Sequence, residues 1–140
     1  MTCRDLARDL GGFKSAMSAE EIALRTIVVE DEPLVRLMTE DILITIGCVI
    51  AAAASNLDEA LSHIAAAEFD LAVLDINLAG TEVYPAAELL RGKGTPIIFV
   101  TGYGRRGVHN AWHEFPILQK PFSPRDLQQA IARIRRPSAQ

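Results

Sequence analysis

The sequence predicts an α/β domain built on a parallel sheet, and three observations support this prediction. Short apolar runs recur along the chain, and segments whose apolar residues follow helical spacing separate them. Parallel strands need a crossover between them, usually a helix, so this alternation is typical of a sheet with helices on both faces. The chain has 140 residues, of which 49% are hydrophobic, so it is long enough for one domain with a substantial core.

The first strand is expected at residues 26–30, a short apolar run. Pro33 suits the first turn of a helix over residues 34–46, which ends before Gly47. Residues 48–54 are all apolar and do not distinguish strand from helix by period. Their length and the turn-forming residues on either side favour a second strand.

The later elements continue the alternation. Asn56 and Glu59 cap a helix with apolar residues at i, i+3, i+4, i+7 and i+8, and residues 71–75 form a third strand of buried character. The remaining elements are a helix over 82–91, a fourth strand over 96–100, a weak helix over 107–112, a fifth strand over 117–120 and a last helix opened by Ser123 and Pro124. Five such units fit a flavodoxin-like, doubly wound (βα)5 fold with strand order 2-1-3-4-5, in which ligands bind beyond the carboxyl ends of strands 1 and 3.

The residues outside these units form two flanks. Residues 1–25 carry four apolar side chains at the spacing of an amphipathic helix: Leu6, Leu10, Phe13 and Met17. Gly11-Gly12 interrupts that pattern, so we expect either a frayed leader with a short helix or an arm that packs on the domain or on a second copy, giving a homodimer. The domain is expected to cover residues 26–136, followed by a tail over 137–140.

The composition excludes several classes of function. The formal net charge of −4 argues against a nucleic-acid-binding surface, which needs clustered Lys and Arg. Two cysteines, Cys3 and Cys48, cannot form the disulfide framework of a small secreted protein, so a cytoplasmic location is the default. No stretch reaches the roughly 18–20 apolar residues of a membrane-spanning helix, and no secretory signal is visible.

Polar residues collect where the expected strands end. The first strand ends in Glu30-Asp31, the third in Asp75, the fourth in Thr101 and the fifth in Lys120. Because these ends lie at one edge of the sheet, the three carboxylates should meet there and raise some of their pKa values. A hard cation such as Mg²⁺ or Mn²⁺ relieves that repulsion, since it prefers oxygen ligands.

The same groups suit phosphoryl transfer to a carboxylate. Asp75 is the expected nucleophile, and a metal ion, the Lys120 ammonium and the Thr101 hydroxyl would balance the charge of the phosphoryl group. Taken singly, each residue has a plainer interpretation as a helix cap, a turn residue or a surface lysine. Their joint occurrence at four strand ends favours a phosphoacceptor site.

Four motifs carry a resemblance to a known family. They are Ile27-Val-Val-Glu-Asp-Glu-Pro33, Phe69-Asp-Leu-Ala-Val-Leu-Asp-Ile-Asn-Leu78, Phe99-Val-Thr-Gly-Tyr103 and Leu118-Gln-Lys-Pro-Phe122. Through them, residues 26–136 resemble the receiver domain of bacterial two-component response regulators. The resemblance implies a stand-alone switch that a sensor histidine kinase phosphorylates, not an enzyme with its own turnover.

The resemblance also implies a role for each polar residue. Asp75 matches the phosphoacceptor, Asp31 a direct metal ligand, and Glu30 a ligand that acts through water. Asn77 matches the residue that lends a backbone carbonyl to the metal, and its side chain would tune dephosphorylation. Thr101 matches the hydroxyl that follows the phosphoryl group during switching.

The last two motifs define the expected switch. Lys120 matches the phosphate-binding lysine, whose bond to Pro121 is often cis in the family. The Phe99–Tyr103 motif is similar to a subgroup with a Phe-Ala-Thr-Gly-Gly/Tyr signature, which often works with HWE-type histidine kinases; Val100 replaces its usual alanine. Leu118 stands where most receivers carry an aromatic switch residue, so rotation of an aromatic ring cannot be the output.

We therefore expect residues 101–107, with three glycines, to be the moving part. Gly102 and Tyr103 are the candidate gate over the phosphoacceptor. Downstream phosphotransfer and effector proteins are the expected partners, and a phosphorelay, a phosphate sink and an allosteric regulator stay open. Neither nucleic acid nor a membrane is expected as a partner.

Other classes of protein fit the sequence less well. A phosphatase of the haloacid dehalogenase type also uses a strand-end Asp, but it needs a second carboxylate two residues later, where this chain has Asn77. A pseudo-receiver adaptor would share the fold but would act through protein contacts without phosphorylation. The complete set of acidic, Thr and Lys residues in this chain argues against it. No Gly-x-Gly-x-x-Gly follows the first strand, which argues against a dinucleotide-binding fold.

Overall fold

The computed structural model describes residues 23–135, in which strands and helices alternate. In chain order the elements are β1 (Arg25–Val29), α3 (Pro33–Ile46), β2 (Val49–Ala54), α4 (Leu57–Ala66), β3 (Leu71–Asp75), β4 (Asn77–Leu78), β5 (Thr81–Glu82), α5 (Tyr84–Gly92), β6 (Ile97–Thr101), two 3₁₀ turns (Gly104–Gly107 and Asn110–Trp112), β7 (Ile117–Gln119) and α6 (Pro124–Arg135). The predictions for residues 1–22 and 136–140 lie outside the described residues. No helix in the described part of the chain has the length and apolar character needed to cross a membrane.

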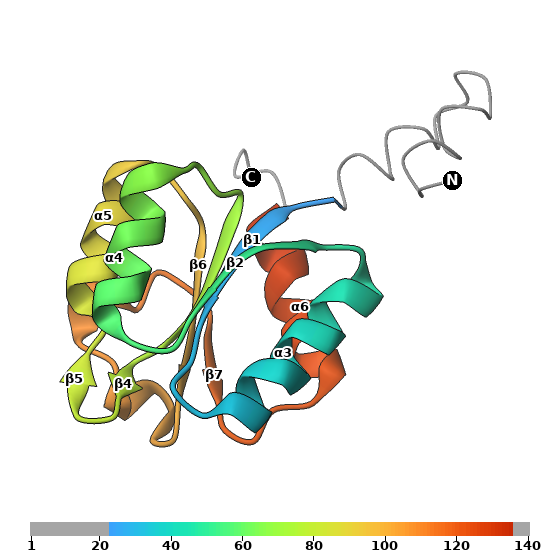
Figure 1. The fold of residues 1–140 in the computed structure, drawn as a ribbon. Coiled ribbons are helices and arrows are strands. Elements are labelled where there is room, and N and C mark those ends of the chain that lie inside the picture. The colour runs from blue at the N-terminus through green and yellow to red at the C-terminus, as the bar shows by residue number, and fades with distance from the viewer. Residues whose placement is uncertain (1–22, 136–140) are drawn as a thin grey trace.

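Five parallel strands form the central sheet, in the order β2-β1-β3-β6-β7. This is the predicted 2-1-3-4-5 order, with β6 and β7 as the fourth and fifth long strands. Helices α3 and α6 cover one face of the sheet, and α4 and α5 cover the other (Figure 1). The doubly wound α/β fold is therefore confirmed.

The core lies on both faces of the sheet because side chains alternate along each strand. All five residues of β3 are buried, as expected for the central strand. Ile27 and Leu74 pack beneath α4 and α5, whereas Val28 and Val73 pack beneath α3 and α6. The two faces together fix the register of β1 against β3, in which Val29 lies opposite Leu74.

Local signals set the ends of the helices. The side chain of Asn56 accepts a hydrogen bond of 2.8 Å from the Glu59 backbone N–H, which caps α4 as predicted. Ser123 and Asp126 bond reciprocally at the start of α6, as in a capping box. Gly47 ends α3 in the left-handed region, at φ 116°.

A short hairpin after β3 was not predicted. Strands β4 and β5 pair antiparallel around Ala79 and Gly80, whose φ angles are 54° and 97°. Two central residues with positive φ are typical of a two-residue hairpin turn. Because residues 81–82 belong to this hairpin, the helix predicted to begin at residue 82 begins at Tyr84 instead.

The weak helix predicted over residues 107–112 is wrong, because the β6–β7 crossover contains only two 3₁₀ turns within the described residues. His109 lies between them in an extended conformation, and its backbone N–H donates to the Tyr84 hydroxyl at 3.0 Å. The two rings stack with centroids 4.2 Å apart. The Arg91 guanidinium lies over the buried Trp112 ring, 3.8 Å from its centroid. These tertiary contacts outweigh a weak local helix preference.

Candidate functional site

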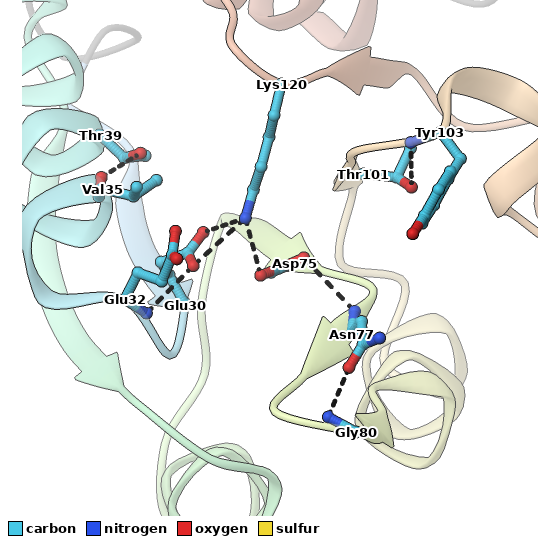
Figure 2. A network of polar contacts seen from close by, with 10 residues as sticks. All are labelled: Glu30, Glu32, Val35, Thr39, Asp75, Asn77, Gly80, Thr101, Tyr103 and Lys120. Carbon is cyan, nitrogen blue, oxygen red and sulfur yellow. Dashed lines mark hydrogen bonds and ion pairs between the residues drawn. The ribbon is translucent and has the colours of Figure 1, made fainter.

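The carboxyl ends of four strands bring the predicted polar residues to one edge of the sheet. Glu30 follows β1, Asp75 ends β3, Thr101 ends β6 and Lys120 follows β7. Neighbouring strands are paired right up to this edge, because Val29 lies opposite Leu74 and Asp75 lies opposite Val100. Figure 2 shows Glu30, Asp75 and Lys120 pointing toward one another from the ends of three different strands.

Three carboxylates converge at this edge. Glu30, Asp31 and Asp75 each offer an oxygen atom, and these atoms lie within 4.8 Å of one another. The exposed fraction is 4% for Glu30 and 5% for Asp75, while Asp31 is half-buried. Carboxylates packed this closely and screened from water repel each other strongly.

The ammonium group of Lys120 partly balances these charges. Its Nζ atom donates to Asp75 Oδ2 at 3.0 Å, and it lies 3.1 Å from Glu30 Oε1. The backbone N–H groups of Glu32 and Asn77 donate to the same two carboxylates, at 3.1 Å and 3.3 Å. Each buried carboxylate therefore has both a charged and a neutral donor.

The pKa values show that this balance is incomplete. Burial, together with the charge of Asp75, raises the pKa of Glu30 to about 7. Burial also raises the pKa of Asp75, although Lys120 pulls it in the opposite direction. Burial alone would lower the pKa of Lys120, but Asp75 and Glu30 outweigh it and raise this pKa. The site is short of positive charge.

The donor set fits a hard divalent cation. Glu30, Asp31 and Asp75 supply only oxygen ligands, which Mg²⁺ and Mn²⁺ prefer. One added cation would offset the cost of burying these charges, which raises the pKa values of Glu30 and Asp75, and the repulsion that Asp75 exerts on Glu30. The predicted carbonyl ligand is that of Asn77. The backbone N–H of the same residue donates a hydrogen bond to Asp75 Oδ1.

Thr101 is buried and lies near the site, but its hydroxyl group faces another way. Its Oγ1 atom accepts a hydrogen bond of 3.1 Å from the Tyr103 backbone N–H (Figure 2). Within the described residues, no hydrogen bond joins the Thr101 hydroxyl to Asp75 or Lys120, although the Lys120 backbone N–H donates to the Thr101 carbonyl at 2.8 Å. The Tyr103 side chain is 74% exposed. Gly107 packs against both residues, since a Cβ atom there would meet Thr101 Oγ1 and come within 3.0 Å of Tyr103 Cβ.

Asn77 holds the turn of the β4–β5 hairpin. Its Oδ1 atom accepts a hydrogen bond of 2.6 Å from the Gly80 backbone N–H, so the side chain points to the turn (Figure 2). Its suggested role in dephosphorylation stays a prediction. The peptide bond between Lys120 and Pro121 is cis, as the resemblance implies.

Sequence reasoning missed two features of this site. Gly107 was counted only as a flexible residue, because no sequence signal shows that its missing Cβ makes room for Thr101. The hydrogen bond from the Glu32 backbone to Glu30 was also missed, although the short turn before Pro33 makes it sterically accessible.

Comparison with known proteins identifies the family. The family model for the response regulator receiver domain matches residues 26–132, and the chain therefore belongs to this family. Members are phosphoacceptor switches in two-component signalling, not enzymes with independent substrates, and they generally bind Mg²⁺ at an acidic pocket like this one. The comparison with curated proteins gives no match.

Several solved structures are similar to this chain. SdrG from Sphingomonas melonis Fr1 is 32% identical with a TM-score of 0.72, and the match covers 79% of this chain and 95% of SdrG. The receiver domain of PhyR from Erythrobacter litoralis is 27% identical with a TM-score of 0.73, covering 84% of this chain and 97% of that domain. The BeF3-activated conformation of SdrG from Pseudomonas melonis Fr1 is 33% identical with a TM-score of 0.68, covering 79% of this chain and 94% of that chain.

Proposed function

We propose that Asp75 accepts a phosphoryl group from a sensor histidine kinase, in a reaction that depends on Mg²⁺ or Mn²⁺. The observation that carries this proposal is the convergence of three carboxylates within 4.8 Å, with the Lys120 ammonium 3.0 Å from Asp75. The similar SdrG chain, which has been solved in a BeF3-activated conformation, supports it.

Asp75 acts as the nucleophile without a general base, because its carboxylate attacks in the ionised form. One of its oxygen atoms forms a bond to phosphorus as the bond from phosphorus to the donor's nitrogen breaks, and the donor retains that electron pair. Glu30, Asp31 and Asp75 would hold the cation together with the Asn77 carbonyl. When bound, the cation supplies positive charge that offsets the charge of the phosphoryl oxygens.

Lys120 holds the other side of the phosphoryl group. Its Nζ atom already contacts both Asp75 and Glu30, so it can follow the new negative charge without leaving the site. A point charge on a flexible stem suits this task. Lys120 thus orients the acceptor before transfer and balances the product afterwards.

Thr101 provides the link between phosphorylation and shape. To donate to the phosphoryl group, the Thr101 hydroxyl must turn toward Asp75, which draws its oxygen away from the Tyr103 N–H that it now accepts from. That rotation frees the backbone of residues 101–107, with Gly102 and Tyr103 as the gate over Asp75. Leu118 is half-buried and not aromatic, so no aromatic ring at that position can rotate to transmit the signal. The loop over residues 101–107 is therefore the proposed signalling element.

The partners are proposed from the same resemblance. A kinase of the HWE type follows from the Phe99–Tyr103 signature, and the signal passes to a downstream phosphotransfer or effector protein by contact or phosphorelay. The pseudo-receiver alternative is not favoured, because the acidic, Thr and Lys residues are all present. The cytoplasmic location stays a prediction from the cysteine count.

Intact mass spectrometry tests the proposal. After incubation with acetyl phosphate and Mg²⁺, the chain should gain one labile phosphoryl group, and Asp75→Asn should gain none. Chelation of the metal with EDTA should abolish the gain. A stable adduct of equal yield on Asp75→Asn would contradict the assignment.

A further inference from the structure

Helix α3 presents an apolar stripe to solvent. The exposed fractions of Leu34, Leu37, Met38 and Ile44 are 74%, 52%, 61% and 56%. At about 100° per residue, these four side chains fall within one third of the helix circumference, opposite the buried Thr39 and Leu43. A single exposed leucine is ordinary, whereas a row of four large apolar side chains marks a contact surface. We name these four residues the α3 stripe.

A groove runs beside this stripe. It has a volume of about 300 Å³ and separates α3 from the loop between β7 and α6. Met38 belongs both to the α3 stripe and to the groove, which is also lined by Val35, Ile42 and Phe122. The stripe and the groove together form a surface that can hold apolar side chains.

The chain enters the domain next to this surface. The carbonyl of Leu24 accepts a hydrogen bond of 2.9 Å from the Val49 backbone N–H, and Val49 lies two residues after Gly47, the C-cap of α3. Leu24 packs on the same core cluster as Ile46, from the last turn of α3. The described part of the chain therefore begins near the C-terminal end of α3, the end at which the α3 stripe finishes with Ile44.

We propose that residues 6–17 of the same chain cover the α3 stripe. Their four apolar residues follow steps of four, three and four positions, the spacing of a seam between two helices: Leu6, Leu10, Phe13 and Met17. In helical form that seam is about 16 Å long, and the stripe from Leu34 to Ile44 is about 15 Å long.

Connection length and charge agree with this placement. Residues 18–22 can span about 17 Å, which lets Met17 reach the Ile44 end of the stripe while Leu6 lies at the Leu34 end. The exposed Asp41 interrupts the stripe, and Lys14 follows Phe13 in the covering segment, so the two charges can pair. Gly11-Gly12 allows the segment to bend along the helix.

Thiol accessibility tests the proposal in the full chain. In a Cys3→Ser background, Leu37→Cys adds one thiol to the α3 stripe. The Cys3→Ser chain without this change is measured in parallel, because its rate reports the reaction of the buried Cys48 alone. We expect the added thiol to react with 5,5′-dithiobis(2-nitrobenzoate) about tenfold faster when Leu10→Ser and Phe13→Ser are also present. Ala16→Ser, which lies off the apolar seam, should leave the slow rate unchanged.

Two outcomes would overturn the proposal. Equal rates with and without the Leu10→Ser and Phe13→Ser pair would show that the segment does not cover α3. Protection that grows with protein concentration, together with a dimer mass by light scattering, would assign the cover to a second copy. The measurement needs neither Mg²⁺ nor a phosphodonor, so its failure is distinguishable from failure of the proposed function.

Discussion

The Lys120 ammonium lies 3.0 Å from Asp75 Oδ2, and the same nitrogen lies 3.1 Å from Glu30 Oε1. One lysine thus joins two buried carboxylates that precede it by 45 and 90 residues. Its single positive charge does not balance three neighbouring carboxylates, because Asp31 also belongs to the cluster. The energetics of the site follow from this imbalance.

Removing the charge of Asp75 should stabilise the metal-free protein. Asp75→Asn keeps the shape of the side chain and relieves the repulsion with Glu30, while Lys120 keeps its contact to Glu30. Since burial raises the pKa of Asp75 despite Lys120, its ionised form is unfavourable in the fold. We expect a gain of about 1 kcal/mol in urea unfolding at pH 8 with EDTA present. A loss of similar size would mean that the pair with Lys120 dominates.

The metal-free protein should become less stable as the pH rises from about 4.5 to about 7. The pKa of Glu30 is about 7 in the fold against a usual 4.5, so the folded state binds more protons across this window. Stability falls with pH wherever the folded state binds more protons than the unfolded state. Urea midpoints at pH 5 and pH 8 measure the effect. Glu30→Gln should reduce the difference, and an unchanged difference would remove Glu30 as its source.

Mg²⁺ should stabilise the protein, and more so at pH 8 than at pH 6. A ligand that binds only the folded state at 100 times its dissociation constant adds about 2.7 kcal/mol. Glu30 must lose its proton to face the cation with full charge, which favours the higher pH. Thermal unfolding with and without Mg²⁺ checks this. Asp31→Asn should weaken the effect, whereas Glu68→Gln, at the exposed turn before β3 and thus at the opposite edge of the sheet, should leave it intact.

Gly107→Ala should disturb Thr101. The added Cβ atom would meet Thr101 Oγ1 and come within 3.0 Å of Tyr103 Cβ, so the loop or the hydroxyl must shift. The expected cost is about 1–3 kcal/mol in unfolding free energy, with a changed rate of phosphorylation by acetyl phosphate. Gly92→Ala is the matched control, since nothing lies within 4 Å of a Cβ atom there. Equal behaviour of the two variants would show that Gly107 makes no room for Thr101.

The sheet could be predicted because its signals are local. Runs such as residues 71–75 are continuously apolar, and Asn56, Gly47 and Ser123 mark helix ends by their own chemistry. Parallel pairing then brings the strand-end carboxylates together without further information. The position of the acidic cluster follows from strand order alone.

The remaining features depend on contacts between distant residues. The crossover after β6 contains 3₁₀ turns instead of an α-helix, and there His109 donates to Tyr84, which lies 25 residues earlier in the chain. Ala79 adopts a positive φ, which its type does not indicate. The direction of the Thr101 hydroxyl depends on the space beside Gly107, and that space exists only in the folded loop.

Chemical trapping of the phosphoryl group tests the central claim most directly. The protein is phosphorylated with acetyl phosphate and Mg²⁺ and reduced with borohydride, which converts an aspartyl phosphate into homoserine, and its peptides are then sequenced by mass spectrometry. The account predicts homoserine at position 75 and at no other aspartate. Homoserine at Asp31 instead, or phosphate retained on a histidine, would contradict it.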